Sequence, residues 1–253
     1  MVVDFKEKKV IIFDLDGTLA LSKSAIDDEM HTLLEKLLEH KKVLVISGGK
    51  WRQFKNQFID HLKLSTLQLS NLFISPGSGS SMYRFEEGEI HEMYAELLSL
   101  ENKERIREAF AYALEKSGVE IPSTHYGEQL EDRQTEMTFS ALGQQAPLEE
   151  KEKWDPDHEK RKMIVKYLEE KIPEFEIGIG GTTSIDITQK GKDKSYGVEQ
   201  ASLRLGIPIE KMVYIGDALF PGGNDEEARK SGVECLPVKD VEETKKVIRE
   251  ILY

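Results

Sequence analysis

The stretch KKVIIFDLDGTLALSK (Lys8–Lys23) joins a short apolar run to two aspartates, a glycine and a threonine. Its apolar part, KVIIF (Lys9–Phe13), is typical of a strand that is covered on both faces. Asp14 and Asp16 follow this run directly. They either form the turn that ends the strand or carry out chemistry there, and the rest of the chain distinguishes the two interpretations.

Alternating strand and helix patterns surround this opening strand. Apolar residues recur at helical spacing between Ile26 and Leu38 and again between Trp51 and Leu62. A strand-like run follows each of these helices, at Val43–Ser47 and at Leu72–Ser75. The βαβαβ order predicts an α/β fold, a Rossmann-like doubly wound parallel sheet with right-handed crossovers.

The pattern changes after the third strand. PGSGSS (Pro76–Ser81) is expected to be a hinge, because a phosphate loop would need a Lys-Ser/Thr pair after it. MYRFEEGEI predicts a hairpin that turns near Glu87-Gly88. Helices are expected at Asn102–Lys116 and Asp157–Lys171, with strand-like runs between and after them. These features predict an inserted α+β cap.

The first pattern returns near the end of the chain. We expect a helix, a strand, a helix and a closing helix at Ser195–Leu205, Met212–Asp217, Glu226–Lys230 and Val241–Leu252. The predicted core therefore consists of residues 1–82 and 189–253, and the predicted cap of residues 83–188.

Composition limits the partners. The 253 residues carry a formal net charge of −12, which disfavours nonspecific binding to nucleic acid or anionic lipid. No apolar stretch reaches the roughly 18 residues that cross a bilayer, and no secretory signal is evident. Cys235 is the only cysteine, and its apolar neighbours favour a buried hydrophobe over a reactive thiol. The histidines show no metal-binding spacing. We expect a cytoplasmic protein without nucleic-acid or membrane partners.

Three acidic residues and a serine follow apolar strands. Ligands of open parallel sheets bind outside the carboxyl ends of the strands, where Asp14, Asp16, Ser47 and Asp217 are expected. Converging carboxylates would repel one another unless a cation joined them. Oxygen ligands together with a phosphate suit Mg²⁺. The sequence therefore predicts a Mg²⁺ site for a phosphorylated substrate.

The spacing of DLD assigns different tasks to its two aspartates. A carboxylate beside a phosphate can act as nucleophile and form an aspartyl-phosphate, which we expect of Asp14. Residues two apart on an extended chain point to the same side, so Asp16 would reach the leaving oxygen as general acid. Gly17 would let the chain turn sharply, and Thr18 offers a hydroxyl to the loop.

Four ordered motifs carry a resemblance to a known superfamily. DLDGTLA resembles the first motif of the haloacid dehalogenase (HAD) superfamily, whose phosphotransferases use an aspartate nucleophile. Ser47 and Gly48 in VISGG resemble its phosphate-binding second motif. Lys194 in GKDKSYGV resembles the lysine of the third motif, and GDALFPGGND resembles the acidic fourth motif. The resemblance implies that Ser47, Gly48 and Lys194 bind the transferring phosphate.

Some positions in these motifs leave alternatives open. Lys190 and Lys192 compete with Lys194, which we favour because it directly precedes a helix. The resemblance implies that Asp14, the backbone carbonyl of Asp16 and Asp217 hold Mg²⁺. Asn224 and Asp225 either support the metal or cap the next helix.

The cap resembles that of one branch of the superfamily. Its insertion after the third strand is similar to the type IIB (C2 cap) group, and its motifs are most similar to the eukaryotic-type phosphomannomutases. RQTEMTFSALG (Arg133–Gly143) looks like their Arg-x-x-Met-x-x-x-Ser-x-x-Gly segment. TTSIDIT looks like their substrate-binding Ser-x-Asp, which implies that Ser184 and Asp186 contact sugar hydroxyls.

Two departures concern the second phosphate that a hexose phosphomutase must hold. The family carries arginines where this chain has Gln144 and Lys23, so that only Arg133 matches outright. Arginine binds phosphate through a bidentate fork. A charge-assisted hydrogen bond contributes about 1.5–3 kcal/mol, so losing one would weaken retention of a bisphosphate intermediate. An ordinary strand arginine paired with a cap carboxylate is the alternative for Arg133.

We therefore expect a Mg²⁺-dependent phosphatase that hydrolyses a small hexose phosphate through an aspartyl-phosphate. The alternative is a phosphomannomutase that interconverts mannose 6-phosphate and mannose 1-phosphate. A signalling receiver also phosphorylates a strand-end aspartate, but it has no use for Asp16 or for a large cap. Mutases of the family pair through their caps, which leaves a homodimer through the cap open.

Overall fold

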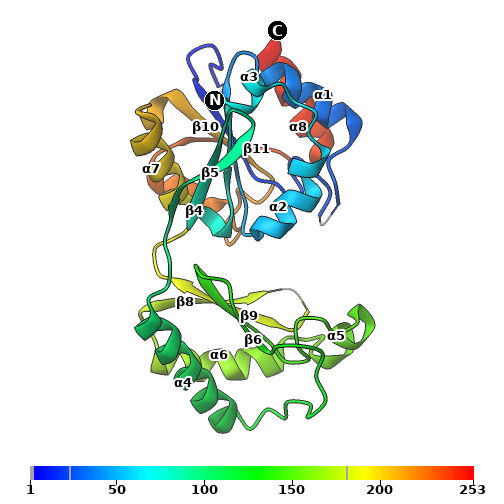
Figure 1. Ribbon diagram of the computed structural model, residues 1–253, viewed down its shortest axis with the longest axis vertical. Coiled ribbons are helices and arrows are strands. Elements are labelled where there is room, and N and C mark those ends of the chain that lie inside the picture. The colour runs from blue at the N-terminus through cyan, green and yellow to red at the C-terminus, as the bar shows by residue number, and fades with distance from the viewer. Residues whose placement is uncertain (1–2, 23, 181) are drawn as a thin grey trace. The chain divides into compact units, whose positions relative to one another are not determined.

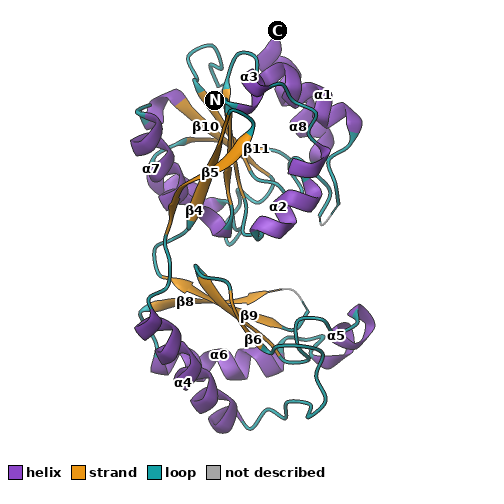
Figure 2. Cartoon of the chain, viewed as in Figure 1, coloured by secondary structure: helices purple, strands orange, loops and turns teal. Residues whose placement is uncertain are grey.

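The computed structural model describes residues 3–22, 24–180 and 182–253. The chain forms two compact units (Figures 1 and 2). Unit 1 contains the residues up to Ala95 and Lys192–Tyr253, and unit 2 contains Glu96–Gly191. No helix among the described residues combines the length and the apolar character needed to cross a membrane.

Unit 1 is built on a seven-stranded sheet with the order β11-β10-β1-β2-β3-β4-β5. Strands β11, β10, β1, β2 and β3 are parallel, whereas β4 and β5 add antiparallel to one edge. The strands are β1 (Val10–Phe13), β2 (Lys42–Ile46), β3 (Leu72–Ser75), β4 (Ser81–Glu86), β5 (Glu89–Ala95), β10 (Met212–Gly216) and β11 (Glu234–Pro237). The mainly parallel sheet confirms the predicted α/β class.

Helices cover both faces of this sheet (Figure 2). Ile11 and Phe13 of β1 join an apolar cluster with residues of α1 and α8, whereas Val10 and Ile12 join a second cluster with residues of α7. This burial explains why KVIIF is apolar at every position after Lys9. The helices are α1 (Asp28–Leu37), α2 (Trp51–Gln57), α3 (Thr66–Leu69), α7 (Lys194–Leu205) and α8 (Val241–Leu252). Short 3₁₀ turns are η1 (Ile59–His61), η2 (Gly77–Gly79), η3 (Ile209–Lys211) and η4 (Glu226–Ser231), the last where an α-helix was expected.

Unit 2 contains a four-stranded antiparallel sheet with the order β6-β7-β9-β8. Met137, Phe139, Ile185 and Ile187 alternate along β7 and β9 and join the apolar core with residues of α4 and α6. Polar residues occupy the intervening positions. The elements are α4 (Leu100–Ser117), β6 (Leu130–Asp132), β7 (Glu136–Ser140), α5 (Leu148–Trp154), α6 (Glu159–Lys171), β8 (Phe175–Gly180) and β9 (Ser184–Gln189).

A buried ion pair supports the start of β9. The Arg161 Nε atom lies 2.7 Å from Asp155 Oδ2, and both side chains are fully buried. Burial alone would raise the pKa of Asp155, but its hydrogen bonds from Arg161 and from the backbone lower it. Arg161 Nη1 also donates to the carbonyls of Gly180 (3.0 Å) and Ser184 (3.4 Å). The pair therefore supports the last residue of β8 and the first residue of β9.

Two expectations about the boundary of the inserted unit differ from the structure. The predicted hairpin forms with its turn at Glu87-Gly88, but β4 pairs with β3, so the hairpin extends the sheet of unit 1. The division of the chain therefore falls after Ala95 and after Gly191, later than the expected limits at residues 82 and 188. The alternating pattern that predicts a hairpin does not reveal which sheet it joins.

The expectation of a hinge at Pro76–Ser81 is wrong. Gly77 N donates to Gly49 O (3.1 Å), and Ser78 N donates to Ser47 O (2.9 Å). Ser75 Oγ donates to Ser81 O (2.6 Å). These bonds fasten the segment to the loop after β2, within unit 1.

Candidate active site

Side chains gather at the carboxyl ends of three parallel strands. Asp14 follows β1, Ser47 follows β2 and Asp217 follows β10. Asp14 and Ser47 are each only 3% exposed. Carboxylate oxygens of Asp14, Asp217 and Asp225 lie within 4.8 Å of one another. The structure thus brings together acidic residues that are about 200 positions apart in the sequence.

Lys194 bridges two of these carboxylates. Its Nζ atom lies 2.6 Å from Asp14 Oδ1 and also donates to Asp225 Oδ1. Burial would lower the pKa of this ammonium, but the charges of Asp14 and Asp225 outweigh it and raise the pKa. Lys194 therefore remains charged inside the site.

The two competing lysines lie elsewhere. Lys190 belongs to unit 2 and donates to the Pro173 carbonyl at 3.4 Å. The Nζ atom of Lys192 lies over the Tyr196 ring, 3.8 Å from its centroid. Lys194 is the one that reaches Asp14, because Asp193 caps the helix through the backbone N–H groups of Ser195 and Tyr196.

A close approach between two glycines sets the position of α7. A Cβ atom on Gly79, whose φ is +102°, would lie 2.7 Å from both the Cα and the N atoms of Gly197. Because neither residue has a side chain, the first turn of α7 can pack against η2. This turn carries Lys194, so the approach determines where its ammonium lies.

Replacing Gly79 by alanine should displace this turn. We expect the free energy of unfolding to fall by about 1–3 kcal/mol from overpacking, and kcat to fall because Lys194 moves. Gly206→Ala is the matched control, since Gly206 also has positive φ (+62°) but its added Cβ would meet nothing within 4 Å. Urea unfolding and steady-state turnover of both variants measure the effect. Equal results for the two variants would show that backbone strain, not the contact, matters.

Asp225 already has a full set of partners. Its Oδ1 accepts hydrogen bonds from Lys194 and from the hydroxyl of Tyr214 (2.5 Å), and its Oδ2 accepts from Ala218 N at 2.9 Å. It precedes η4 but its side chain makes no capping bond. Asp225 thus anchors Lys194 and closes the loop after β10. Asn224 is exposed, and its proposed support of a metal stays a prediction.

Asp217 is held by the loop after β1. Thr18 Oγ1 donates to Asp217 Oδ1 at 2.9 Å and accepts from Asp217 N at 3.0 Å. A Cβ atom on Gly17, whose φ is +88°, would lie 2.5 Å from Asp217 Oδ2, so that only glycine fits there. The sequence shows a hydroxyl at position 18 but not its partner, which is 199 residues away.

Asp16 lies outside the acidic cluster that includes Asp14. Its carboxylate accepts hydrogen bonds from Gln53 Nε2 (2.6 Å) and Gln57 Nε2 (3.2 Å), both on α2. The expectation that Asp14 and Asp16 point to the same side assumed an extended chain. The strand ends at Phe13 and Leu15 lies in a bend, so the chain is not regularly extended here, and the shared direction stays a prediction. The glutamines are contacts that sequence analysis missed.

Ser47 and Gly48 form the loop after β2. Ser47 Oγ accepts from Gly49 N at 3.1 Å, which tightens the turn. A Cβ atom on Gly48 would lie 3.3 Å from Ser78 Oγ. The second motif is thus packed against the segment Pro76–Ser81, and the strand that precedes it, β2, pairs with β1, which Asp14 follows.

The acidic cluster fits a divalent cation. Asp14 Oδ2 and Asp217 Oδ2 accept no hydrogen bond from any described residue, whereas the other oxygen of each is engaged. Burial raises the pKa of Asp14 to about 7, and the charges of Asp225 and Asp217 add to this rise while Lys194 opposes it. Two free carboxylate oxygens with excess negative charge are a donor set that suits Mg²⁺.

Without metal, the protein should lose stability as pH rises through about 7. The folded-state pKa of Asp14 lies above its unfolded value of 3.8, so its contribution is fully present below pH 3.8 and is lost as the buried carboxyl ionises. Thermal unfolding between pH 5.5 and 8.5 in EDTA measures this decline. Mg²⁺ should raise Tm more at pH 8 than at pH 6. A Mg²⁺ effect that is independent of pH would contradict the prediction.

The expected recognition residues of unit 2 lie around one face of its sheet. Arg133 Nη1 contacts Glu136 Oε1 at 2.9 Å and Asp186 Oδ1 at 3.6 Å. Arg133 also pairs with Glu131, and its Nη2 donates to Gln144 Oε1 at 3.2 Å. Thr138 Oγ1 donates to Asp186 Oδ1 at 2.6 Å. Arg133, Gln144 and Asp186 therefore form one network, in which carboxylates surround the arginine.

Ser184 is not among the residues that contact Arg133. Ser184 pairs with Ser140 at the start of β9, and its carbonyl accepts from Arg161. Lys23 was expected to bind substrate, but it lies outside the described residues.

Comparisons with known proteins find relatives that match most of the chain. A family model described as haloacid dehalogenase-like hydrolase matches residues 11–227. A probable phosphomannomutase of Caenorhabditis elegans is 26% identical over 227 residues, covering 87% of this chain and 85% of the relative. Phosphomannomutase 2 of Dictyostelium discoideum is 27% identical over 227 residues, covering 86% and 85%.

A solved structure shares the fold. Trehalose-6-phosphate phosphatase of Aspergillus fumigatus aligns with a TM-score of 0.59 at 16% identity, covering 98% of this chain and 95% of that chain. The family match spans Asp14, Ser47, Lys194 and Asp217 and extends over most of the chain. The chain belongs to the haloacid dehalogenase-like hydrolase family and is an enzyme that acts on phosphate groups.

Proposed function

We propose that the protein is a Mg²⁺-dependent phosphotransferase for a hexose phosphate and that it works through an aspartyl-phosphate on Asp14. The observation that carries this proposal is the environment of Asp14. Asp14 lies at the carboxyl end of β1. Its Oδ1 is fixed by Lys194, and its Oδ2 accepts no hydrogen bond from a described residue. A buried, oriented carboxylate with a free oxygen is well placed to act as nucleophile.

The proposed reaction has two half-steps. An Asp14 oxygen attacks phosphorus, the bond from phosphorus to the sugar oxygen breaks, and Asp16 gives its proton to that oxygen. Water or a sugar hydroxyl then gives its proton to Asp16 and attacks the phosphoryl group, which frees Asp14. Ser47 and Lys194 bind the transferring oxygens. Mg²⁺ held by Asp14, the Asp16 carbonyl and Asp217 would offset negative charge.

Asp16 must leave Gln53 and Gln57 before it can protonate a leaving group. Its two hydrogen bonds to these amides hold it on the side of α2. We therefore propose that substrate binding coincides with reorientation of Asp16.

Mutase activity is the form of this function that the relatives favour. Curated proteins named phosphomannomutase match most of this chain and most of their own length. This supports the phosphomannomutase alternative more than the hydrolysis that we first expected. In this role the protein would interconvert mannose 6-phosphate and mannose 1-phosphate. A bisphosphate intermediate would turn around between the half-steps, with Arg133, Gln144, Ser184 and Asp186 holding its sugar and second phosphate.

Hydrolysis remains the second candidate, because of the environment of Arg133. Glu131, Glu136 and Asp186 surround its guanidinium, and Gln144 supplies an amide in place of a second cation. Three carboxylates repel an incoming phosphate. Weak retention of a bisphosphate would leave the phosphoryl group on Asp14 to water.

An assay with mannose 1-phosphate separates the two candidates. Turnover is measured in Mg²⁺, with and without a hexose 1,6-bisphosphate, by quantifying mannose 6-phosphate and inorganic phosphate together. We expect mannose 6-phosphate to form faster and to depend on the bisphosphate. Release of inorganic phosphate alone would establish the phosphatase, and no turnover of any hexose phosphate would reject both. EDTA should abolish either activity.

We also propose a cellular location and a dimer. The single cysteine and the metabolite-like substrate support a cytoplasmic location. Pairing of two chains through unit 2 is proposed from the behaviour of similar mutases, and sedimentation equilibrium tests it.

A further inference from the structure

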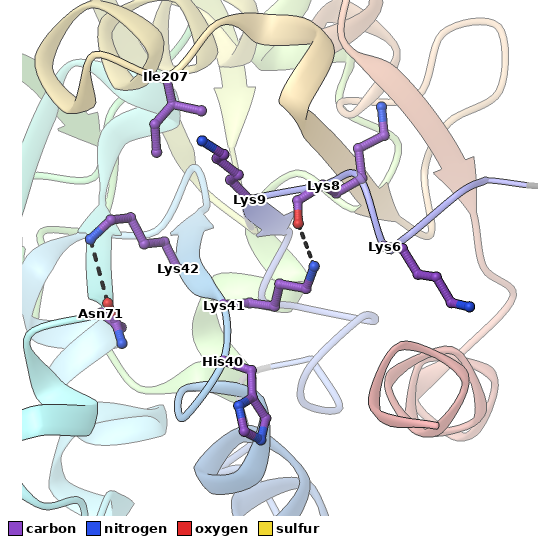
Figure 3. A pocket seen from close by; sticks show the side chains of 8 residues that line it. All are labelled: Lys6, Lys8, Lys9, His40, Lys41, Lys42, Asn71 and Ile207. Carbon is purple, nitrogen blue, oxygen red and sulfur yellow. Dashed lines mark hydrogen bonds between the residues drawn. The ribbon is translucent and has the colours of Figure 1, made fainter.

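Lysines collect at the amino ends of the parallel strands, the edge of the sheet opposite to Asp14. Lys9 precedes β1, Lys42 begins β2 and Asn71 precedes β3. They line a cavity of about 280 Å³ within unit 1 (Figure 3). The lining residues are Lys6, Lys8, Lys9, His40, Lys41, Lys42, Asn71 and Ile207. Five lysines thus share one pocket in a chain whose net charge is −12.

Most of this positive charge is not neutralised by the protein. Lys8 pairs with Glu234 at 2.8 Å. Within residues 3–22, 24–180 and 182–253, the structure shows no ion pair for Lys6, Lys9, Lys41 or Lys42. In a chain with twelve more acidic than basic residues, four unpaired ammonium groups in one place need an explanation.

Three of these lysines are held in defined positions. Lys41 Nζ donates to the carbonyls of Phe5 (2.8 Å) and Lys8 (2.5 Å), so it fastens the N-terminal loop to β2. Lys42 Nζ lies 3.4 Å from Asn71 Oδ1. Lys9 is fixed through its backbone, because its N–H donates to Lys211 O and its carbonyl accepts from Lys42 N. Figure 3 shows the side chains of Lys9 and Lys42 extending toward Ile207 and Asn71, whereas those of Lys6 and Lys8 extend away from them.

The partial burial of Lys41 also favours binding of an anion. It lowers the pKa of Lys41, and the charges of Glu7 and Asp4 only partly oppose this. An anion in the cavity would stabilise the charged ammonium.

The surroundings limit the anion to a compact one. Carboxylates lie near residues of the pocket, at Asp4, Glu7, Glu39 and Glu234, and they would repel the extended backbone of a nucleic acid. No phenylalanine, tyrosine or tryptophan is among the residues that line it, so a nucleobase would have none of these larger rings to stack on. The volume is near the lower end of the roughly 300–1,000 Å³ that small-molecule pockets have.

We propose that this pocket binds a small molecule with two phosphoryl groups, held by Lys9, Lys41, Lys42 and the Asn71 side chain. It is a second anion site, separate from the catalytic one. Asp14 and Lys9 lie at opposite ends of β1, about 16 Å apart along the strand. Binding here does not depend on which phosphate ester the catalytic site uses.

Calorimetric titration of the metal-free full chain with inorganic pyrophosphate, at about 0.1 M salt, tests the proposal. We expect saturable binding to the wild type and weaker binding of inorganic phosphate. Lys9→Gln/Lys42→Gln should weaken pyrophosphate binding at least about tenfold, because it removes two charge-assisted bonds. The matched control is Lys63→Gln/Lys246→Gln, which changes two exposed lysines of unit 1 by the same charge. Its affinity should remain within about twofold of wild type.

Two further measurements keep the result unambiguous. Ile207→Glu, which adds a carboxylate to the pocket without removing a lysine, should also abolish pyrophosphate binding. Turnover of p-nitrophenyl phosphate in Mg²⁺ should be unchanged in Lys9→Gln/Lys42→Gln, which shows that the catalytic site is intact. The proposal is overturned if wild type fails to bind pyrophosphate. It is equally overturned if both double variants bind with the same affinity, since binding would then lie at the catalytic site or be nonspecific.

Discussion

Asp14→Asn should reduce kcat by roughly four to six orders of magnitude, because it removes the proposed nucleophile. The amide cannot form an acyl-phosphate, and the remaining groups can only position substrate and water. The fold should persist. Burial and neighbouring carboxylates already raise the pKa of Asp14, so a neutral side chain should leave the metal-free protein at least as stable. Steady-state turnover and thermal unfolding at pH 8 measure the two effects.

A chemical trap makes this prediction specific. Wild type quenched during turnover and treated with borohydride should carry homoserine at position 14, detected by peptide mass spectrometry. Asp14→Asn should show no such product. Asp16→Asn is the matched comparison, with an expected loss of about 10²–10⁴-fold for a sugar phosphate. Its loss should be smaller for p-nitrophenyl phosphate, whose leaving group needs no proton. Activity of Asp14→Asn within tenfold of wild type would refute the proposed mechanism.

Lys194→Met should cost both stability and catalysis. It leaves Asp14 and Asp225, both buried, without their common counter-ion, and breaking a buried ion pair on one side destabilises a protein by about 3–5 kcal/mol. It also removes a cation from the transferring phosphate, for which we expect kcat to fall at least about 10²-fold. Urea unfolding and turnover at saturating substrate measure these losses.

Lys190→Met provides the control for this variant. Lys190 lies in the same sequence motif, but it is exposed, and its ammonium donates to the Pro173 carbonyl. Its replacement should change neither quantity appreciably. Mg²⁺ should partly restore the stability of Lys194→Met, because the cation replaces the lost positive charge. Equal behaviour of the two variants would contradict the assignment of Lys194.

Local patterns were sufficient to predict the parallel sheet and the residues at its carboxyl edge. Four apolar, β-branched runs locate β1, β2, β3 and β10, and the topology of such a sheet brings Asp14, Ser47 and Asp217 to one edge. The helices with wide apolar stripes are equally evident. These features are determined by residues that lie close together in the sequence, which is why sequence analysis finds them.

Contacts between distant segments were not predictable in the same way. The hairpin β4–β5 has the same pattern whether it joins unit 1 or unit 2, and only pairing with β3 decides. Gly79 was attributed to a hinge, yet its lack of a side chain serves the approach of Gly197, 118 positions away. The direction of Asp16 depends on Gln53 and Gln57, whose spacing on α2 gives no sign of a partner.

The place of β10 in the sheet has a consequence for synthesis of the chain on the ribosome. Strand β1 pairs with β2 on one side and with β10 on the other, and β10 begins only at Met212. Every strand of unit 2 has therefore been translated before β1 can acquire its second neighbour. Since domains fold as units during translation, unit 2 can reach its native structure first. Until β10 is translated, the edge of β1 that pairs with it remains unpaired.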